Sequence, residues 1–218
     1  MSSLDAGFTV AEDCYSLAEC DRILDWQALS SVGTRCLLEN GWCKRLAEDL
    51  RSRLSATIPE IASLVTVQCT YFNKSASQNW FVAYHQDRSI PVAPSAIAQR
   101  WPGYSQKEGM TYIQGSDELL SRLVAVRLHL DSTTSGNGAL RVIPHSHCNG
   151  TLSPEQIQSL RSTACEQLLL VAKGGVVAMR PLLLHASSKS RVSSDRRILH
   201  FLFGPTSLPE GLAWQLAV

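Results

Sequence analysis

Two short motifs in this 218-residue sequence bring a histidine and an aspartate to positions i and i+2. They are H-Q-D at His85–Asp87 and H-L-D at His129–Asp131. Because alternate side chains of a β-strand point to the same side, either motif could present an imidazole and a carboxylate to one metal ion. Two histidines and one carboxylate on one face of Fe(II) leave coordination positions open, an arrangement that oxygenases use. H-x-D motifs also arise by chance, so either one needs support from a third ligand.

His185 is the candidate third ligand for the first motif. It lies near the end of an apolar run, residues 175–186, and a second run at 196–204 follows after a polar turn. We interpret the two runs as a β-hairpin, which would place Arg196 close to His185 across the ladder, within a residue or two of register. A dicarboxylate cosubstrate could then chelate the metal at one end and meet the Arg196 guanidinium at the other. Strand alternation sends Arg197 to the opposite face, and a surface position for Arg196 is the alternative.

Short apolar and aromatic runs fill the chain from about residue 64 onward and could position these side chains. Glycine, proline, serine and asparagine separate the runs, which is typical of β-strands. Strand candidates at this spacing indicate a β-sandwich or barrel of the jelly-roll type. They cover residues 64–72, 81–87, 123–131, 139–144, 168–172, 175–186 and 196–204.

Two segments interrupt the strand candidates. Residues 88–121 contain several prolines and glycines, and we expect a long loop there of the kind that forms lids or binding loops. The other segment, residues 153–163, is predicted to form a helix. Ser153 can cap this helix, Pro154 fits its first position and Gln156 completes a capping box.

The first 63 residues are expected to be mainly helical. Apolar residues recur every four positions from Trp42 to Leu54, which marks one face of an amphipathic helix. We therefore expect a single domain over residues 1–218, mainly β, in which flanking helices of residues 1–63 accompany a β core at residues 64–204.

The composition describes an ordinary globular chain. Lys and Arg number 20 against 19 Asp and Glu, and 44% of residues are hydrophobic. A net charge near zero argues against a nucleic-acid or acidic-membrane partner, and no apolar run reaches the roughly 18 to 20 residues of a membrane span. The N-terminus shows no secretory signal, and the seven cysteines include no C-x-x-C pair. We expect a cytoplasmic protein whose partner is a small molecule.

Four segments, in order along the chain, resemble the phytanoyl-CoA dioxygenase-like branch of the Fe(II)/2-oxoglutarate-dependent oxygenases. They are YHQD, LHLDSTTSGNGALRVIPHSHCNG, GGVVAMRPLLLHASS and RRILHF. The likeness covers roughly residues 66–204. It implies a double-stranded β-helix, which is a cupin-like jelly-roll core, and this agrees with the strand pattern.

The resemblance implies a metal centre and a cosubstrate site. It assigns Fe(II) to His85, Asp87 and His185. It assigns the far carboxylate of 2-oxoglutarate to Arg196, with Ser187 as a hydroxyl partner.

The resemblance also bears on residues around this centre. It places Gln68 near the cosubstrate and directs Arg127 toward it, although Arg127 could instead hold an anionic substrate or form a structural salt bridge. It implies structural roles for Asp131 and His147. His145 stands where the family usually has a small residue, and the sequence does not explain this departure.

The activity that the resemblance implies is hydroxylation of a small organic molecule, which consumes dioxygen and 2-oxoglutarate and releases succinate and carbon dioxide. The presence of Asp87 favours hydroxylation, because halogenating relatives lack this carboxylate, while desaturation and ring formation use the same triad. One alternative is a cupin-like metal-dependent hydrolase or isomerase, which needs the triad but not Arg196. The other is a non-catalytic small-molecule-binding barrel that keeps the fold but not the iron.

Overall fold

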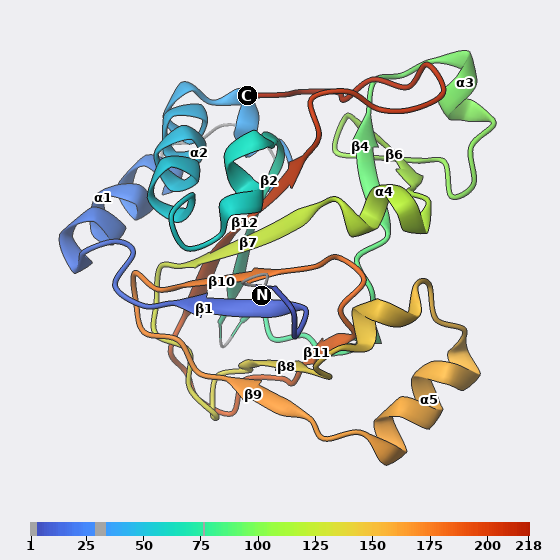
Figure 1. Cartoon of the computed structure of the whole chain (residues 1–218). Helices are drawn as coiled ribbons and strands as arrows, with labels where there is room; N and C mark the ends of the chain where they lie inside the picture. The colour runs from blue at the N-terminus through green and yellow to red at the C-terminus, as the bar shows by residue number, and fades with distance from the viewer. Residues whose placement is uncertain (1–3, 29–33, 76) are drawn as a thin grey trace.

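The structure is a computed structural model that describes residues 4–28, 34–75 and 77–218 (Figure 1). The strands are β1 (Phe8–Ala11), β2 (Val65–Lys74), β3 (Val82–His85), β4 (Ser89–Val92), β5 (Ser105–Lys107), β6 (Met110–Gln114), β7 (Val124–His129), β8 (Leu140–Val142), β9 (Gln167–Leu169), β10 (Val176–Met179), β11 (His185–Ser187) and β12 (Arg196–Gly204). The α-helices are α1 (Leu17–Ala28), α2 (Gly41–Leu54), α3 (Ala96–Gln99), α4 (Asp117–Ser121) and α5 (Pro154–Thr163). Short 3-10 helices are η1 (Leu37–Glu39), η2 (Pro59–Ser63) and η3 (Ser146–Asn149).

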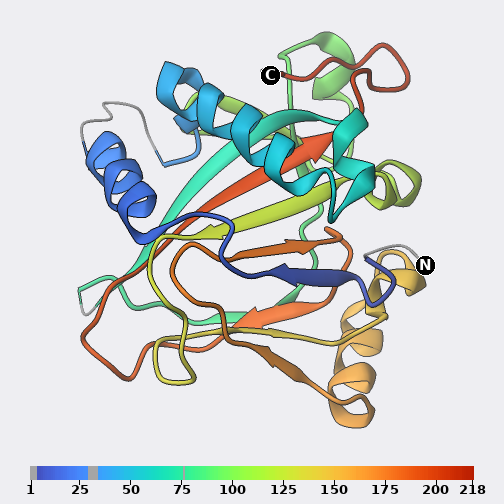
Figure 2. The same ribbon diagram turned by 60° about the vertical axis from the view of Figure 1, so that its left-hand side comes forward.

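The strands form three antiparallel sheets. A five-stranded sheet has the order β1-β10-β7-β12-β2, and a four-stranded sheet has the order β3-β11-β8-β9. A smaller sheet has the order β4-β6-β5. The four-stranded sheet lies below the five-stranded one in Figures 1 and 2, and α5 lies beside it. This two-sheet arrangement confirms the mainly β, jelly-roll expectation.

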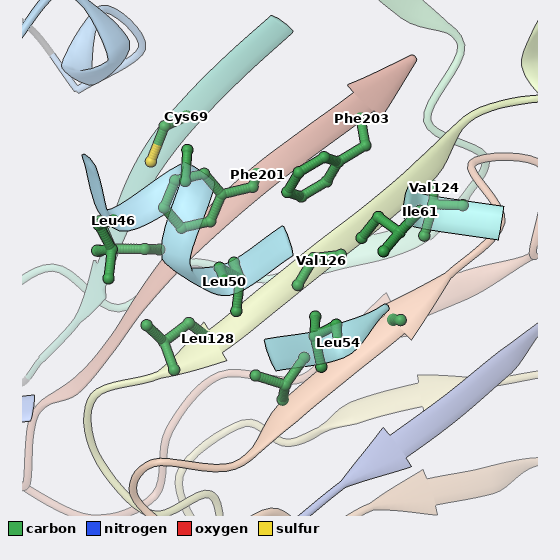
Figure 3. Packing of buried hydrophobic residues seen from close by; sticks show 14 of the residues in the cluster. Leu46, Leu50, Leu54, Ile61, Cys69, Val124, Val126, Leu128, Phe201 and Phe203 are labelled. Atoms are coloured by element: carbon green, nitrogen blue, oxygen red, sulfur yellow. The ribbon is translucent and has the colours of Figure 1, made fainter. Parts of the chain in front are cut away.

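The central strands β7 and β12 divide their side chains between the two faces of the five-stranded sheet. On one face, Val126 and Phe201 are fully buried in a cluster with Leu50 of α2 (Figure 3). Because strand side chains alternate, the intervening residues Arg127 and His200 point to the opposite face, toward the four-stranded sheet. The apolar cluster under α2 thus anchors the strands that carry polar residues into the interior between the sheets.

The expected hairpin between residues 175–186 and 196–204 is wrong. The first run divides into β10 and β11 around a turn, in which Pro181 has no N–H for a ladder and the Leu183 N–H donates to the Arg180 carbonyl at 3.0 Å. β11 then pairs with β3 and β8, whereas β12 pairs with β2 and β7. The strands before and after the polar turn therefore belong to different sheets.

Residues 88–121 do not form the long loop that their prolines and glycines predicted. They contain the sheet β4-β6-β5 and the helices α3 and α4. Pro91 is accommodated because β4 is an edge strand, where a missing N–H breaks no ladder. Glu108 and Gly109 both have positive φ and join β5 to β6, as a two-residue hairpin turn requires.

The helical expectations are largely met. α1 and α2 lie in the predicted N-terminal region, but β1 also lies there and adds an edge strand to the five-stranded sheet. The predicted capping box of α5 is present: Ser153 Oγ accepts from Gln156 N–H, and Gln156 Oε1 accepts from Ser153 N–H at 2.8 Å. Among the described residues, no helix is long and apolar enough to cross a membrane.

Candidate metal centre

Strand pairing brings His85, Asp87 and His185 together. His85 ends β3 and is the register partner of His185, which begins β11, and their ring centroids are 4.2 Å apart. Asp87 follows two residues after His85, and its carboxylate oxygens lie 3.4 Å from His85 Nε2 and 3.6 Å from His185 Nε2. One ligand atom from each side chain lies within 4.8 Å of the others. The three residues form the arrangement that a two-histidine, one-carboxylate metal centre needs.

The other ring nitrogens of the two histidines are held by the backbone. His85 Nδ1 lies 2.9 Å from the Ala83 carbonyl, and His185 Nδ1 lies 2.8 Å from the Leu183 carbonyl. A carbonyl only accepts, so each Nδ1 carries the proton and each Nε2 presents a lone pair toward Asp87. Outer hydrogen bonds of this kind fix the tautomer and the orientation that a metal-binding imidazole requires.

Electrostatics favour the protonation states of metal ligands at Asp87 and His185. At His85, burial is outweighed by the hydrogen bond and the charge of Asp87, which raise the pKa of this imidazole. Burial opposes the charged form of Asp87, but the neighbouring His185 and His85 outweigh it and hold the pKa of this carboxyl well below its usual range. Burial lowers the pKa of His185 to about 4, so this imidazole is neutral near pH 7. A cation could therefore bind at an ionised Asp87 without first displacing a proton from His185.

Arg196 and Lys74 form a second cluster, on the five-stranded sheet. They are register partners in β12 and β2, and Arg196 is 3% exposed while Lys74 is fully buried. Arg196 makes no side-chain hydrogen bond or ion pair with any described residue, and its buried Nε has no partner. Burial, followed by the charge of Arg127, lowers the pKa of Arg196 to about 10. A buried, charged and unpaired guanidinium is a site for an anion.

Ser187 connects this cluster to the triad. Lys74 Nζ donates to Ser187 Oγ at 2.9 Å and to the Ser188 carbonyl at 2.7 Å, and Ser187 Oγ donates to the Gly138 carbonyl at 2.7 Å. Gly138 has a φ of +79°, and a Cβ there would lie 2.6 Å from the Ser188 carbonyl oxygen. The close backbone approach at this glycine therefore maintains the position of Ser187, two residues beyond His185.

Gln68 and Arg127 occupy the inner face of the five-stranded sheet. Gln68 Nε2 donates to Thr70 Oγ1 at 2.9 Å and to Tyr112 Oη at 3.1 Å. Arg127 lies 3.1 Å, from Nη1 to Nδ1, from His200, its register partner on β12. The alternative of a structural salt bridge for Arg127 is wrong, because no carboxylate among the described residues lies within ion-pair distance of it.

One cavity of about 370 Å³ joins the triad to Gln68, Arg127, Ser187 and Arg196, whereas Lys74 is not among its lining residues. Ligand pockets typically lie in the range of roughly 300–1,000 Å³, so the space suits small molecules. Tyr112 of β6 also contributes to the wall, which ties the small sheet of residues 88–121 to the cavity. The lining of the cavity includes the triad, Gln68, Ser187, Arg127, Arg196 and His200.

Two of these features were missed by reasoning from the sequence. His200 was given no role, although it stands four residues after Arg196 on the same strand and therefore on the same face. No sequence motif indicates a role for Lys74, which ends β2 and pairs with Arg196. The alternation within RRILHF could have revealed His200, whereas the burial of Lys74 depends on a pairing between distant segments.

The remaining histidines and the second H-x-D motif lie outside the centre. Asp131 forms an ion pair with Arg197 on the outer side of β12, with Nε–Oδ2 2.7 Å apart, which confirms its structural role. His129 Nδ1 is 2.6 Å from Thr133 Oγ1. His145 is exposed and has a φ of +63°, so the departure from a small residue occurs at a left-handed position where glycine is favoured and histidine is tolerated. His147 is not part of the cluster of candidate metal ligands.

Comparison with solved structures agrees with this fold. HygX from Streptomyces hygroscopicus, solved with nickel and 2-oxoglutarate bound, has a TM-score of 0.62 and 16% identity, over 93% of this chain and 84% of that one. AviO1 from Streptomyces viridochromogenes Tue57 has a TM-score of 0.61 and 18% identity, over 94% and 93% of the two chains. The non-heme alpha-ketoglutarate-dependent epimerase SnoN from nogalamycin biosynthesis has a TM-score of 0.64 and 12% identity, over 93% and 80%.

Comparison at the sequence level identifies the family. No curated protein sequence matches the chain significantly. The sequence profile of the phytanoyl-CoA dioxygenase (PhyH) family matches residues 4–198, which is most of the chain. On this match the chain belongs to the phytanoyl-CoA dioxygenase (PhyH) family.

Proposed function

We propose that this chain is an Fe(II)- and 2-oxoglutarate-dependent dioxygenase that hydroxylates a small organic molecule. The observation that carries the proposal is the triad of His85, Asp87 and His185, whose ligand atoms lie within 4.8 Å of one another on the wall of a cavity that also contains the unpaired Arg196. Membership of the PhyH family supports the same activity.

The described residues fit the metal and the cosubstrate. Two imidazole nitrogens and a carboxylate are suitable ligands for Fe(II), and both imidazoles have the tautomer that leaves Nε2 free. The orphaned Nε of Arg196 fits a carboxylate that would complete its hydrogen bonding. Structures of HygX with iron bound, and with nickel and 2-oxoglutarate bound, support this pair of cofactors for the fold.

When bound, iron and 2-oxoglutarate supply the oxidative chemistry, in which dioxygen is consumed and succinate and carbon dioxide are released. The chain's own residues hold and orient the reactants. Arg196 would grip the far carboxylate, with Ser187 held beside it by Lys74, and Gln68 would line the same side of the cavity.

Hydroxylation is the reaction outcome that we propose, with a small molecule as substrate. A HygX structure with hygromycin B bound supports small-molecule substrates for this fold. SnoN is described as an epimerase, so related structures perform more than one reaction. Mass spectrometry of the product distinguishes the outcomes, because hydroxylation adds one oxygen atom, desaturation and ring formation each remove two hydrogens, and epimerisation leaves the mass unchanged.

The test of the function is 2-oxoglutarate turnover. The protein is loaded anaerobically with Fe(II) and 2-oxoglutarate, air is admitted, and succinate is measured with a range of small substrates. We expect succinate from the wild type and none from Asp87→Ala, while Asp131→Ala, the matched change in the second H-x-D motif, retains activity. Metal binding without any succinate would instead favour the hydrolase or isomerase alternative, and absence of metal binding would favour a non-catalytic barrel.

A further inference from the structure

Arg127 and His200 form a cross-strand pair on the wall of the cavity. Arg127 Nη1 donates to His200 Nδ1 at 3.1 Å. Because His200 Nδ1 accepts this bond, the ring proton is on Nε2, and that N–H is a donor. The guanidinium has further N–H groups, of which the buried Nε has no partner among the described residues. The pair therefore offers the cavity hydrogen-bond donors only.

The charge of Arg127 has little compensation. The side chain is 9% exposed, and burial lowers its pKa against the opposing charge of Asp87. Asp87 is committed to the proposed metal and to both histidines. A guanidinium that is buried without its own carboxylate is costly unless a ligand supplies the anion.

Arg127 and His200 interact electrostatically with residues of the triad. Asp87 acts on both Arg127 and His200, and His185 and His85 also act on His200. Arg196 instead interacts with the charges of Arg127 and of Lys74, its register partner. The cavity wall thus carries two arginines, of which Arg127 interacts with a metal ligand.

Charge balance indicates what the second group binds. An Fe(II)–Asp87 unit and a 2-oxoglutarate dianion, together with Arg196 and Lys74, leave the interior with a net positive charge before Arg127 is counted. Arg127 adds a further positive charge on the cavity wall. A neutral substrate would leave this buried charge uncompensated.

We propose that Arg127 and His200 bind an oxyanion of the substrate, such as a carboxylate, sulfate or phosphate group. The inference rests on the proposed function, because it identifies the pair as the substrate side of the same cavity. The guanidinium fork would hold two oxygens, and His200 Nε2–H would donate to the anion beside it. Such a grip would position the substrate by its charged end.

The test uses protein that is loaded with nickel in place of iron and saturated with 2-oxoglutarate. Sulfate and acetate serve as probes and are titrated by calorimetry at constant ionic strength. We expect at least one probe to bind the wild type. Arg127→Gln should weaken it by about tenfold or more, because a hydrogen bond to a charged group contributes roughly 1.5–3 kcal/mol. His200→Leu should weaken it as well.

Two controls separate this site from the cosubstrate site. Arg191→Gln removes one exposed positive charge and should leave probe binding unchanged. Arg196→Gln should weaken 2-oxoglutarate binding, measured on nickel-loaded protein, whereas Arg127→Gln should change it by less than about twofold. Circular dichroism and nickel binding check that each variant is folded.

Three results would overturn the assignment: neither probe binds the wild type, Arg127→Gln leaves probe binding intact, or Arg127→Gln weakens 2-oxoglutarate as much as Arg196→Gln does. Failure of the proposed function has a different signature, because the nickel-loaded wild type would then fail to bind 2-oxoglutarate at all.

Discussion

Single residues in the candidate site act as cross-strand pairs. His85 pairs with His185, while Arg196 pairs with Lys74. A cross-strand pair brings side chains that are far apart in sequence to within direct contact, and it does so with the rigidity of two strands. The ligands and the anion-binding groups are therefore held by backbone pairing that exists before any ligand binds.

Arg196 and Arg197 allow a matched test at this scale. Arg196→Leu should weaken 2-oxoglutarate binding by roughly 10- to 100-fold, because charge-assisted hydrogen bonds to the far carboxylate are lost. Iron or nickel affinity should stay unchanged. Arg197→Leu breaks the outward ion pair with Asp131 and should leave 2-oxoglutarate affinity unaltered. Calorimetry on nickel-loaded protein measures both affinities, and equal losses in the two variants would refute the assignment.

Lys74 predicts a pH dependence of cosubstrate binding. Burial, followed by the charges of Arg196 and Arg127, lowers the pKa of Lys74 to about 8. As pH rises through this value, the ammonium is lost, so its attraction for the nearby carboxylate is lost and 2-oxoglutarate should bind more weakly. Below about pH 7 the ammonium is fully formed and the affinity should level off.

The groups that face Lys74 are those two arginines, the Trp80 ring at 5.4 Å and the Ser187 hydroxyl. Among these, Lys74 is the group that titrates near pH 8. Lys74→Met should abolish the weakening between pH 7 and 9, whereas Lys189→Met, at an exposed position, should retain it. A pH profile that is the same in wild type and Lys74→Met would contradict the role of Lys74.

Elements differ in how much of their stability comes from their own sequence. α5 has a capping box and only partly buried apolar side chains, Ile157 and Leu160, which pack against a small cluster. The strands of the two larger sheets depend on partners from distant parts of the chain. Local signals thus specify α5 well. Local signals specify poorly which strands β11 and β12 pair with, because each strand pairs within a different sheet.

Removal of the cap tests this local control. Ser153→Ala should lower the free energy of opening α5 by about 1 kcal/mol, because one N-terminal N–H loses its acceptor. The backbone amides of residues 157–163 should then exchange hydrogen about fivefold faster, while metal affinity stays constant. Ser159→Ala, at an exposed position within the helix, is the control and should not speed exchange. Unchanged exchange after Ser153→Ala would show that the cap contributes nothing.

The molecule as a whole holds the metal ligands on two adjacent strands of the four-stranded sheet, next to the five-stranded sheet that carries the cations. Clustering of an anionic carboxylate and two imidazoles prepares a site that a divalent cation would stabilise. Folding and metal binding should consequently be linked.

The linkage predicts a thermal shift. Nickel at 100 times its Kd should raise the unfolding free energy by about 2.7 kcal/mol, which corresponds to roughly 5–10 °C in Tm for a chain of this size. A chelator should reverse the shift, and Asp87→Ala should abolish it. Asp131→Ala should lower the starting Tm but keep the shift, and loss of the shift in this variant would place the site elsewhere.

The sequence by itself determined the strand-rich character of the chain and the capped helix at Ser153. The spacing of His85 and Asp87 also indicated two of the three candidate metal ligands. These features depend on residues that are close in sequence, where period-two alternation and capping chemistry act directly. His185 and Arg196 were also candidates, but through a hairpin that the structure does not contain, and the likeness to a family assigned the same two residues independently.

Tertiary structure alone decided how those residues meet. His185 and Arg196 share a cavity as members of different sheets, and the hairpin expected from their spacing does not exist. The burial of Lys74 and the pairing of Arg127 with His200 likewise come from contacts between distant strands. The physical reason is that side-chain alternation determines which way a residue points along its own strand, whereas long-range strand pairing determines what it then faces.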